Sequence, residues 1–236
     1  MYSELLDNIM DRVQPVVTEL EIEGRKYVSG SIKPVLEPTA SRIDITTLTG
    51  MVNYLNDNVD KLDHSALLIH VESPTVVKVY SSIIGDFKQR ECFLMASPIL
   101  PNLRFDSWIP ADEFNIHLQA AFINDPDTHK SQMLSIIGNI REEGIKDTAD
   151  DGVTQVVTVR QGIARLGEET LPNPVLLRPY RTFVEVEQPM SEFVFRMESG
   201  PVCRLIEADG NAWRNKAMLD IASFLKEKLP ELAVIS

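Results

Sequence analysis

Three short apolar runs, at residues 66–71, 75–80 and 91–96, most constrain how this chain can fold. Each is rich in aliphatic and β-branched residues, and Pro or Gly separates one run from the next, as is typical of strands. Parallel neighbours need a crossover of roughly a dozen residues or more, usually a helix, whereas antiparallel neighbours need only a turn. We therefore expect an antiparallel meander in the middle of the chain.

Amphipathic segments on both sides of this meander predict helices. Apolar residues recur at helical spacing in four places, and each segment has a suitable capping or first-turn residue. The first helix begins after Ser3 and ends at Pro15, and the second follows Thr46 or Thr47. The third begins at Pro110, and the last runs from the cap Asn211 to Leu229. Their expected buried faces are Leu5, Leu6, Ile9 and Val13; Leu48, Met51, Val52, Leu55, Val59 and Leu62; Phe114, Leu118, Ala121 and Phe122; and Met218, Ile221, Leu225 and Leu229.

The remaining segments are expected to be strands and loops. A hairpin is predicted from 18–22 and 25–28 around Gly24, and Pro34 and Pro38 mark an extended connector. Further strands are expected at 133–140, 153–160, 182–188, 192–198 and 202–208. Alternation in 182–188 would place Val184 and Val186 on one face and Glu185 and Glu187 on the other. In 192–198, Phe193, Phe195 and Met197 would share a face. An acidic loop at 147–152 would join two of these strands.

This order of elements predicts an α+β fold of largely antiparallel sheets with about four helices packed on them. No low-complexity linker divides residues 1–236, so we expect a single domain. Charge changes near residue 150, which marks a possible sub-boundary. Residues 1–154 carry a net charge of −11, whereas the strand-rich part from 155 to 236 carries −1.

The net charge of −12 disfavours binding to duplex DNA, because that binding requires basic side chains that neutralise phosphates. Cys92 and Cys203 both lie in apolar runs, where a free cysteine behaves as a small buried hydrophobe. Two cysteines without an evident secretory leader favour a reducing cytoplasm. No apolar run approaches the ~20 residues needed to span a bilayer. We therefore expect a cytoplasmic protein without membrane association.

Sequence motifs for catalysis are absent from the chain. There is no glycine-rich phosphate loop, no nucleophile elbow and no zinc-binding HExxH helix. The four histidines, His64, His70, His117 and His129, are not at metal-ligand spacing. Two acidic loops, 124–129 and 147–151, offer carboxylates for a hard cation, with solvated loops as the alternative interpretation. We therefore expect no cofactor and a chain that is not an enzyme.

Two clusters remain as candidate sites. The first combines Arg178, Tyr180 and Arg181, which lead into the strand predicted at 182–188, with Trp213 and Arg214, which begin the last helix. Arginine and aromatic side chains suit stacking on a flat, phosphorylated ligand, but they equally suit a salt-bridged turn anchored by the tryptophan. Glu185 and Glu187 could hold a divalent ion, or lie on an exposed strand face.

The chain is similar over most of its length to an uncharacterised family of phage and prophage proteins from Gram-positive hosts. The resemblance rests on 150–159 (DDGVTQVVTV), 178–189 (RPYRTFVEVEQP) and 207–214 (EADGNAWR). It implies a protein made in the host cytoplasm, and it transfers no catalytic residues.

Three functions follow as hypotheses. The first is a non-catalytic phage accessory protein that self-associates and binds a host or phage protein through its acidic surface. The second is a protein that binds a nucleotide or small anion through the arginine and aromatic cluster. The third is a metal-dependent hydrolase or nuclease that uses Glu185 and Glu187.

Overall fold

The computed structural model describes residues 18–22, 25–29, 39–85, 88–138, 145–150, 154–161, 164–198, 200 and 202–236. The chain divides into two compact units, Met1–Thr39 and Ala40–Ser236. The change of charge near residue 150 does not coincide with this division. The expected first helix between Ser3 and Pro15 and the connector at Pro34 and Pro38 lie outside the described residues.

In the first unit, β1 (Thr18–Ile22) pairs antiparallel with β2 (Arg25–Ser29). The register places Ile22 opposite Arg25 and Thr18 opposite Ser29, so two residues separate the strands. Two-residue connections are the commonest in hairpins. The predicted hairpin is confirmed.

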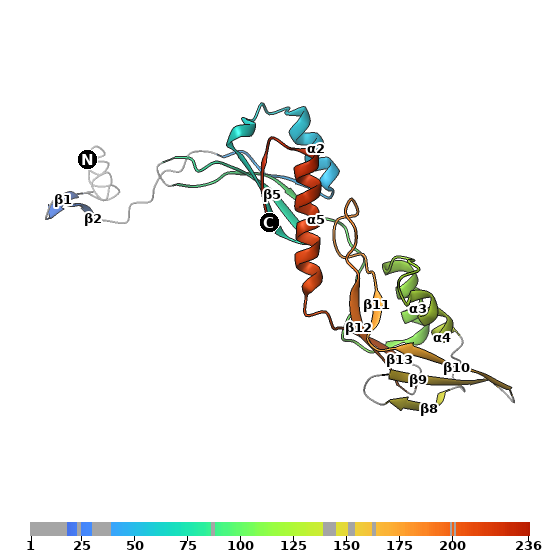
Figure 1. The fold of residues 1–236 in the computed structure, drawn as a ribbon. Coiled ribbons are helices and arrows are strands. Elements are labelled where there is room, and N and C mark those ends of the chain that lie inside the picture. The colour runs from blue at the N-terminus through green and yellow to red at the C-terminus, as the bar shows by residue number, and fades with distance from the viewer. Residues whose placement is uncertain are drawn as a thin grey trace, which may run out of the picture. The chain divides into compact units, whose positions relative to one another are not determined.

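The second unit contains a five-stranded sheet whose centre is the predicted meander (Figure 1). Strands β4 (Leu67–Ser73), β5 (Val76–Ser81) and β6 (Cys92–Ala96) pair antiparallel. At the edges, β3 (Ile43–Ile45) and β14 (Ala233–Ile235) pair parallel with β6 and β4. Alternate residues such as Ile69, Val71, Val77 and Val79 have no exposed surface, so one face is fully covered.

Helices α2 (Leu48–Asp57) and α5 (Ala212–Lys228) contribute to that cover. Thr47 caps α2 as predicted, since its side chain accepts a hydrogen bond from the Gly50 N–H at 3.0 Å. The helix ends earlier than expected, at Asn58 in the left-handed conformation, and Val59 is 69% exposed. The apolar spacing therefore continues beyond the helix, and Leu62 packs on the same cluster from a loop.

The same unit contains a second sheet, which is four-stranded and antiparallel, with the strand order β11-β12-β13-β7. Its strands are β7 (Ile109–Pro110), β11 (Val175–Leu177), β12 (Ser191–Glu198) and β13 (Val202–Glu207). Phe193, Phe195 and Met197 are buried on one face of β12 as predicted. They pack against α3 (Ala111–Ala121), which follows Pro110 as predicted, and α4 (Lys130–Gly138).

The strand predicted at 133–140 is wrong, because the chain is helical there as far as Gly138, in α4. Met133, Ile136 and Ile137 are buried in one cluster with α3, at helical spacing. A short apolar run fits a buried helix and a buried strand equally well by period alone. Lys130, the first residue of α4 and three positions before Met133, is buried as well and belongs to the same helical face.

Strands β8 (Ile145–Asp150), β9 (Thr154–Gln161) and β10 (Ala164–Pro172) form an antiparallel three-stranded sheet. The strand expected at 153–160 is confirmed. The acidic loop expected at 147–152 is wrong in its first part, because Asp147 and Asp150 lie in β8, opposite Thr158 and Gln155.

The strand predicted at 182–188 is wrong. This segment forms turns and irregular backbone around the buried side chain of Gln188. The Gln188 amide oxygen accepts from the Arg181 and Thr182 N–H groups, and its amide nitrogen donates to Phe183 O at 2.8 Å. Val184 is 70% exposed, whereas Val186 packs against the cluster that contains α2 and α5, so the two valines do not share a face as predicted.

The fold is α+β, as predicted, with four α-helices and mostly antiparallel sheets in the described residues. Cys92 and Cys203 are free, and Cys203 is fully buried in the cluster under α3. Among the helices that the structure describes, none combines the length and the apolarity needed to cross a bilayer.

Candidate functional site

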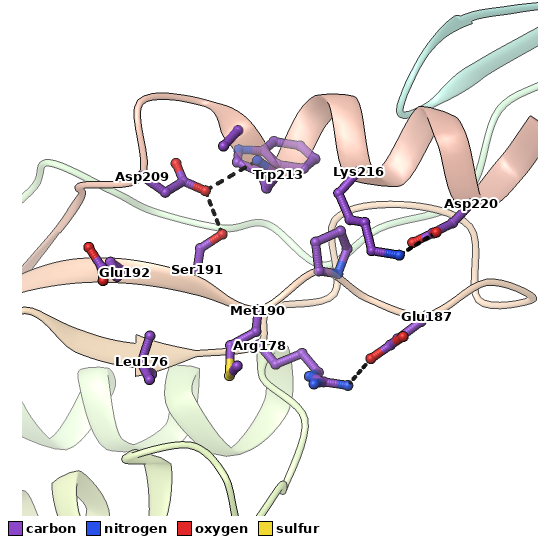
Figure 2. Close-up of a pocket in the computed structure, with 12 residues that line it drawn as sticks. Leu176, Arg178, Glu187, Met190, Ser191, Glu192, Asp209, Trp213, Lys216 and Asp220 are labelled. Atoms are coloured by element: carbon purple, nitrogen blue, oxygen red, sulfur yellow. Dashed lines mark hydrogen bonds and ion pairs between the residues drawn. The ribbon is translucent and has the colours of Figure 1, made fainter.

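A pocket of about 400 Å³ opens beside the first turns of α5 (Figure 2). One wall is the helix, and the other is the end of β11, the start of β12 and the irregular segment between them. The lining residues are Leu176, Arg178, Glu187, Pro189, Met190, Ser191, Glu192, Asp209, Ala212, Trp213, Lys216 and Asp220. The lining therefore combines four carboxylates and two cations with apolar side chains.

Asp209 holds the start of α5, the helix that forms one wall of the pocket. Its carboxylate accepts hydrogen bonds from the Asn211 N–H at 3.0 Å, the Trp213 N–H at 3.4 Å and the Ser191 hydroxyl at 2.6 Å. A carboxylate here satisfies free N–H groups and complements the helix dipole. Asn211, the predicted cap, instead adopts the left-handed conformation with φ of 67° and makes no side-chain cap bond. The prediction of Asn211 as a side-chain cap is wrong, and Asp209 provides the capping bonds.

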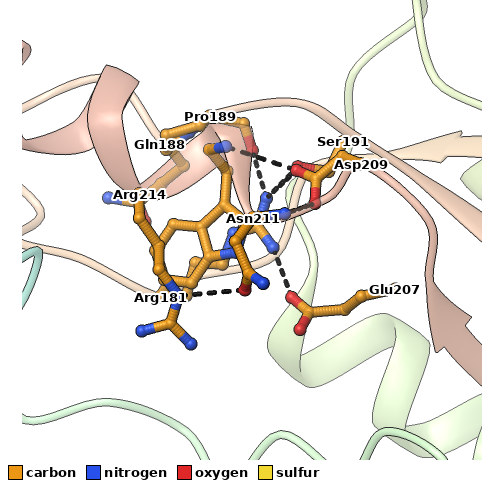
Figure 3. A network of polar contacts seen from close by, with 9 residues as sticks. Arg181, Gln188, Pro189, Ser191, Glu207, Asp209, Asn211 and Arg214 are labelled. Carbon is orange, nitrogen blue, oxygen red and sulfur yellow. Dashed lines mark hydrogen bonds and ion pairs between the residues drawn. The ribbon is translucent and has the colours of Figure 1, made fainter.

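Arg181 lies at the centre of a polar network that reaches Asp209 (Figure 3). Its side chain is 4% exposed, and its guanidinium donates to Glu207 at 2.9 Å and to the hydroxyl of Ser191. Burial lowers the pKa of Arg181 to about 10, opposed by Glu207 and Asp209. The guanidinium therefore remains charged at neutral pH, held by groups of its own chain.

Trp213 contacts two of the predicted ligand-binding arginines. The Arg181 guanidinium is 4.0 Å from its ring centroid, and that of Arg214 is 4.9 Å. Both separations fall within the range of cation–π contacts. The sequence-based grouping of Arg181, Trp213 and Arg214 matches their proximity, but the indole stacks on arginines of the same chain.

Arg178 is also engaged within the chain. Its Nε lies 3.2 Å from Asp125, and its Nη1 donates to Glu187 at 2.7 Å. Tyr180 is half-buried, and its backbone N–H donates to Ala121 O at 2.9 Å. Of the five predicted ligand-binding residues, Arg178 and Trp213 line the pocket, whereas Tyr180, Arg181 and Arg214 do not.

The two candidate metal ligands have separate partners. Glu185 accepts a hydrogen bond from the Thr49 N–H at 3.0 Å, in the first turn of α2. Glu187 pairs with Arg178 at the pocket. The strand on which their shared orientation depended is not formed. The described residues contain no group of three His, Cys, Asp or Glu side chains placed to hold a metal ion.

The other polar residues considered from the sequence have local roles. His129 Nδ1 accepts from the Leu176 N–H at 2.8 Å, and Asp125 accepts from the Asp127 N–H at 2.9 Å. His117 packs edge-on against Phe122, with ring centroids 5.8 Å apart. The side chains of 147–151 lie outside what the structure describes.

The sequence interpretation missed Lys216, Asp220 and Glu192. Lys216 and Asp220 are four residues apart on α5 and form an ion pair beside the pocket. Their spacing on a predicted helix is a readable signal of a pair. Glu192 gives no comparable signal, because only the packing of α5 near β12 brings it to the pocket.

Comparison with known proteins gives no match: no family model, curated protein or solved structure is similar to this chain. The interpretation of the site therefore depends on its geometry.

Proposed function

We propose that this chain is a non-catalytic accessory protein of a phage or prophage that binds another protein in the host cytoplasm. The observation that supports this most directly is the pocket beside α5. Its four carboxylates outnumber its two cations, and Met190, 41% exposed, presents apolar surface at the same place. Acidic side chains around an exposed apolar residue suit a basic, amphipathic protein surface.

The state of the arginines argues for this function over binding of a nucleotide or small anion. Arg181 and Arg178 each contact two carboxylates of the chain. A phosphate group would have to displace those carboxylates or enter beside them, against like charge. A basic partner meets no such opposition.

The overall charge supports the same conclusion. A net charge of −12 accelerates association with a cationic partner and makes that association sensitive to salt. Self-association is part of the proposal, since the five-stranded sheet ends in short edge strands at β3 and β14, where Ile43 and Ile235 are 42% and 48% exposed. Such edges offer hydrogen-bonding groups to another chain.

The test is affinity capture of the full-length tagged protein from the cytoplasm of phage-infected Gram-positive cells, followed by reconstitution with the purified partner. We expect light scattering to show a stoichiometric complex. Its dissociation constant should rise as salt increases from about 50 to 200 mM, because salt screens the attraction between opposite charges. An isolated protein that forms no complex, and whose melting temperature rises with nucleotides or with Mn²⁺, would contradict the proposal.

A further inference from the structure

We infer that the pocket beside α5 binds a lysine or arginine side chain of the partner protein, with the cation at Asp220. This inference rests on the proposed function, and it names the chemistry that the pocket recognises. It depends on groups in the pocket whose bonding capacity is unused in the free protein.

Asp220 is the first of these groups. Its Oδ1 accepts from Lys216, whereas its Oδ2 is buried and has no hydrogen-bond partner among the described residues. An unmet carboxylate oxygen is costly, because it has lost water without gaining a donor. An incoming ammonium or guanidinium group provides that donor.

Lys216 shows that this carboxylate accepts a cation. The lysine side chain is 58% exposed, and pairs of this kind on a helix surface contribute little to stability. A ligand that makes several contacts at once can therefore displace it. Lys216 is in this sense an intramolecular competitor for the position at Asp220.

Glu192 adds negative charge at the end of the pocket opposite Asp220 (Figure 2). It is exposed on β12 at the pocket, and it has no ion-pair partner within the described part of the chain. Its neighbours Pro189 and Met190 lie on the same side of the pocket, and Met190 is exposed. The aliphatic stem of a basic side chain would pack on this apolar surface while its head reaches the Asp220 carboxylate.

Trp213 distinguishes a protein segment from a simple cation. It lines the pocket, is 8% exposed, and its indole Nε1–H has no acceptor among the described residues. An indole N–H is a donor only. A peptide carries carbonyl acceptors next to its basic side chain, whereas a polyamine carries donors alone.

The experiment measures binding of a fluorescent, end-blocked peptide with one central arginine to the full-length protein. Matched peptides carry lysine or the uncharged analogue citrulline, and spermidine is the fourth ligand. We expect the arginine and lysine peptides to bind and the citrulline peptide to bind at least roughly tenfold more weakly, as for loss of a charged hydrogen bond. Spermidine binding as tightly as the peptides would overturn the assignment to a protein segment.

Variants of α5 test the position of the cation. Asp220→Asn should weaken binding of the arginine peptide by roughly tenfold, and Lys216→Ala should tighten it roughly two- to fivefold by removing the competitor. The matched controls are Glu227→Gln and Lys228→Ala, which change the same charges on the same helix in a pair away from the pocket. Equal effects in the pocket variants and the controls would show a general charge effect and overturn the inference.

Measuring the affinity of these variants for a captured natural partner distinguishes failure of this inference from failure of the proposed function. If Asp220→Asn retains wild-type affinity for the captured partner, the pocket is not the binding position, although the protein still acts through protein contacts. If no partner exists but the arginine peptide binds with the expected variant profile, the proposed function fails and the side-chain recognition stands.

Discussion

Arg181 and Lys130 are the two buried cations among the described residues, and they are stabilised differently. Arg181 contacts carboxylates, whereas Lys130 donates to the carbonyls of Gln119 at 3.4 Å and Phe122 at 2.5 Å, at the end of α3. The carboxyl end of a helix offers unpaired carbonyls that attract positive charge. Burial lowers the pKa of Lys130 because no carboxylate opposes the loss of water.

The pairing of Arg181 leads to the first prediction. Arg181→Leu leaves Glu207 and Ser191 without their donor, so we expect the free energy of unfolding to fall by about 3 kcal/mol. Urea titration followed by tryptophan fluorescence measures this change, because Trp213 stacks on the guanidinium. Arg204→Leu is the control. Arg204 pairs with the exposed Asp106, and its loss should cost about 1 kcal/mol or less. Equal losses in the two variants would contradict the structural role given to Arg181.

The second prediction concerns His117. Burial, and then the neighbouring Arg104, lower the pKa of His117, while Glu113 opposes them. The unfolded chain therefore binds a proton at a higher pH than the folded protein does. Stability should fall as pH decreases through the ordinary histidine pKa of about 6.5 and should stop falling, for this group, below the depressed pKa of the folded state.

His117→Gln tests this assignment, because glutamine retains a side-chain acceptor near the Arg104 N–H, which lies 3.5 Å from Nε2. The difference in unfolding free energy between wild type and variant, measured from pH 7.5 to 5, isolates the histidine. We expect the variant to lose less stability over this interval. An unchanged difference across the interval would show that His117 does not titrate differently on folding.

At the scale of elements, the start of α5 organises the candidate site. Asp209→Ala removes the acceptor of three hydrogen bonds, and we expect it to lower the free energy of unfolding by about 1–2 kcal/mol. Asn211→Gly should change it by less than about 0.5 kcal/mol, since glycine adopts the left-handed conformation without strain. Chemical denaturation of both variants measures the contrast. A larger loss for Asn211→Gly than for Asp209→Ala would assign the cap to Asn211.

Elements whose apolar period is reinforced by turn or capping residues were predictable from the sequence, whereas the period alone did not suffice. The strands of the meander have Pro or Gly between them, and Thr47 and Pro110 mark the starts of two helices. The run around Met133 fits two periods, so packing against α3 decides between them. The segment 182–188 alternates like a strand, but the buried amide of Gln188 captures its backbone groups. That competition depends on burial, which the sequence does not show.

The candidate site follows the same rule. Grouping Arg181 with Trp213 was possible, because an arginine-rich turn and a helix start are separately visible in the sequence. Their internal pairing was not, since Glu207 and Ser191 reach the guanidinium only through the pairing of β12 with β13. The pocket likewise requires α5 beside the irregular segment, a contact without a local signal.

At the scale of the whole molecule, residues 40–236 bury two separate hydrophobic clusters. One lies between α3, α4 and the four-stranded sheet, and the other lies between α2, α5 and the five-stranded sheet. The segment after β11 connects them. Leu177 belongs to the first cluster and Phe183 to the second, and the Thr182 hydroxyl donates to Pro74 O at 2.5 Å. This short, hydrogen-bonded connection should make the two clusters unfold together.

Amide hydrogen exchange of two cavity-forming variants tests that coupling. Leu118→Ala opens a cavity in the first cluster and Leu55→Ala in the second, where the two leucines are 0% and 1% exposed; each should cost about 2–5 kcal/mol. If the clusters unfold together, each variant lowers the protection of β5 and β12 by the same free energy, because the slowest amides exchange through global unfolding. Leu118→Ala lowering protection in β12 while leaving β5 at the wild-type level would show two independent units. The segment with Arg181 and Gln188 would then be a flexible connection, and the pocket beside α5 would not be held by a single cooperative fold.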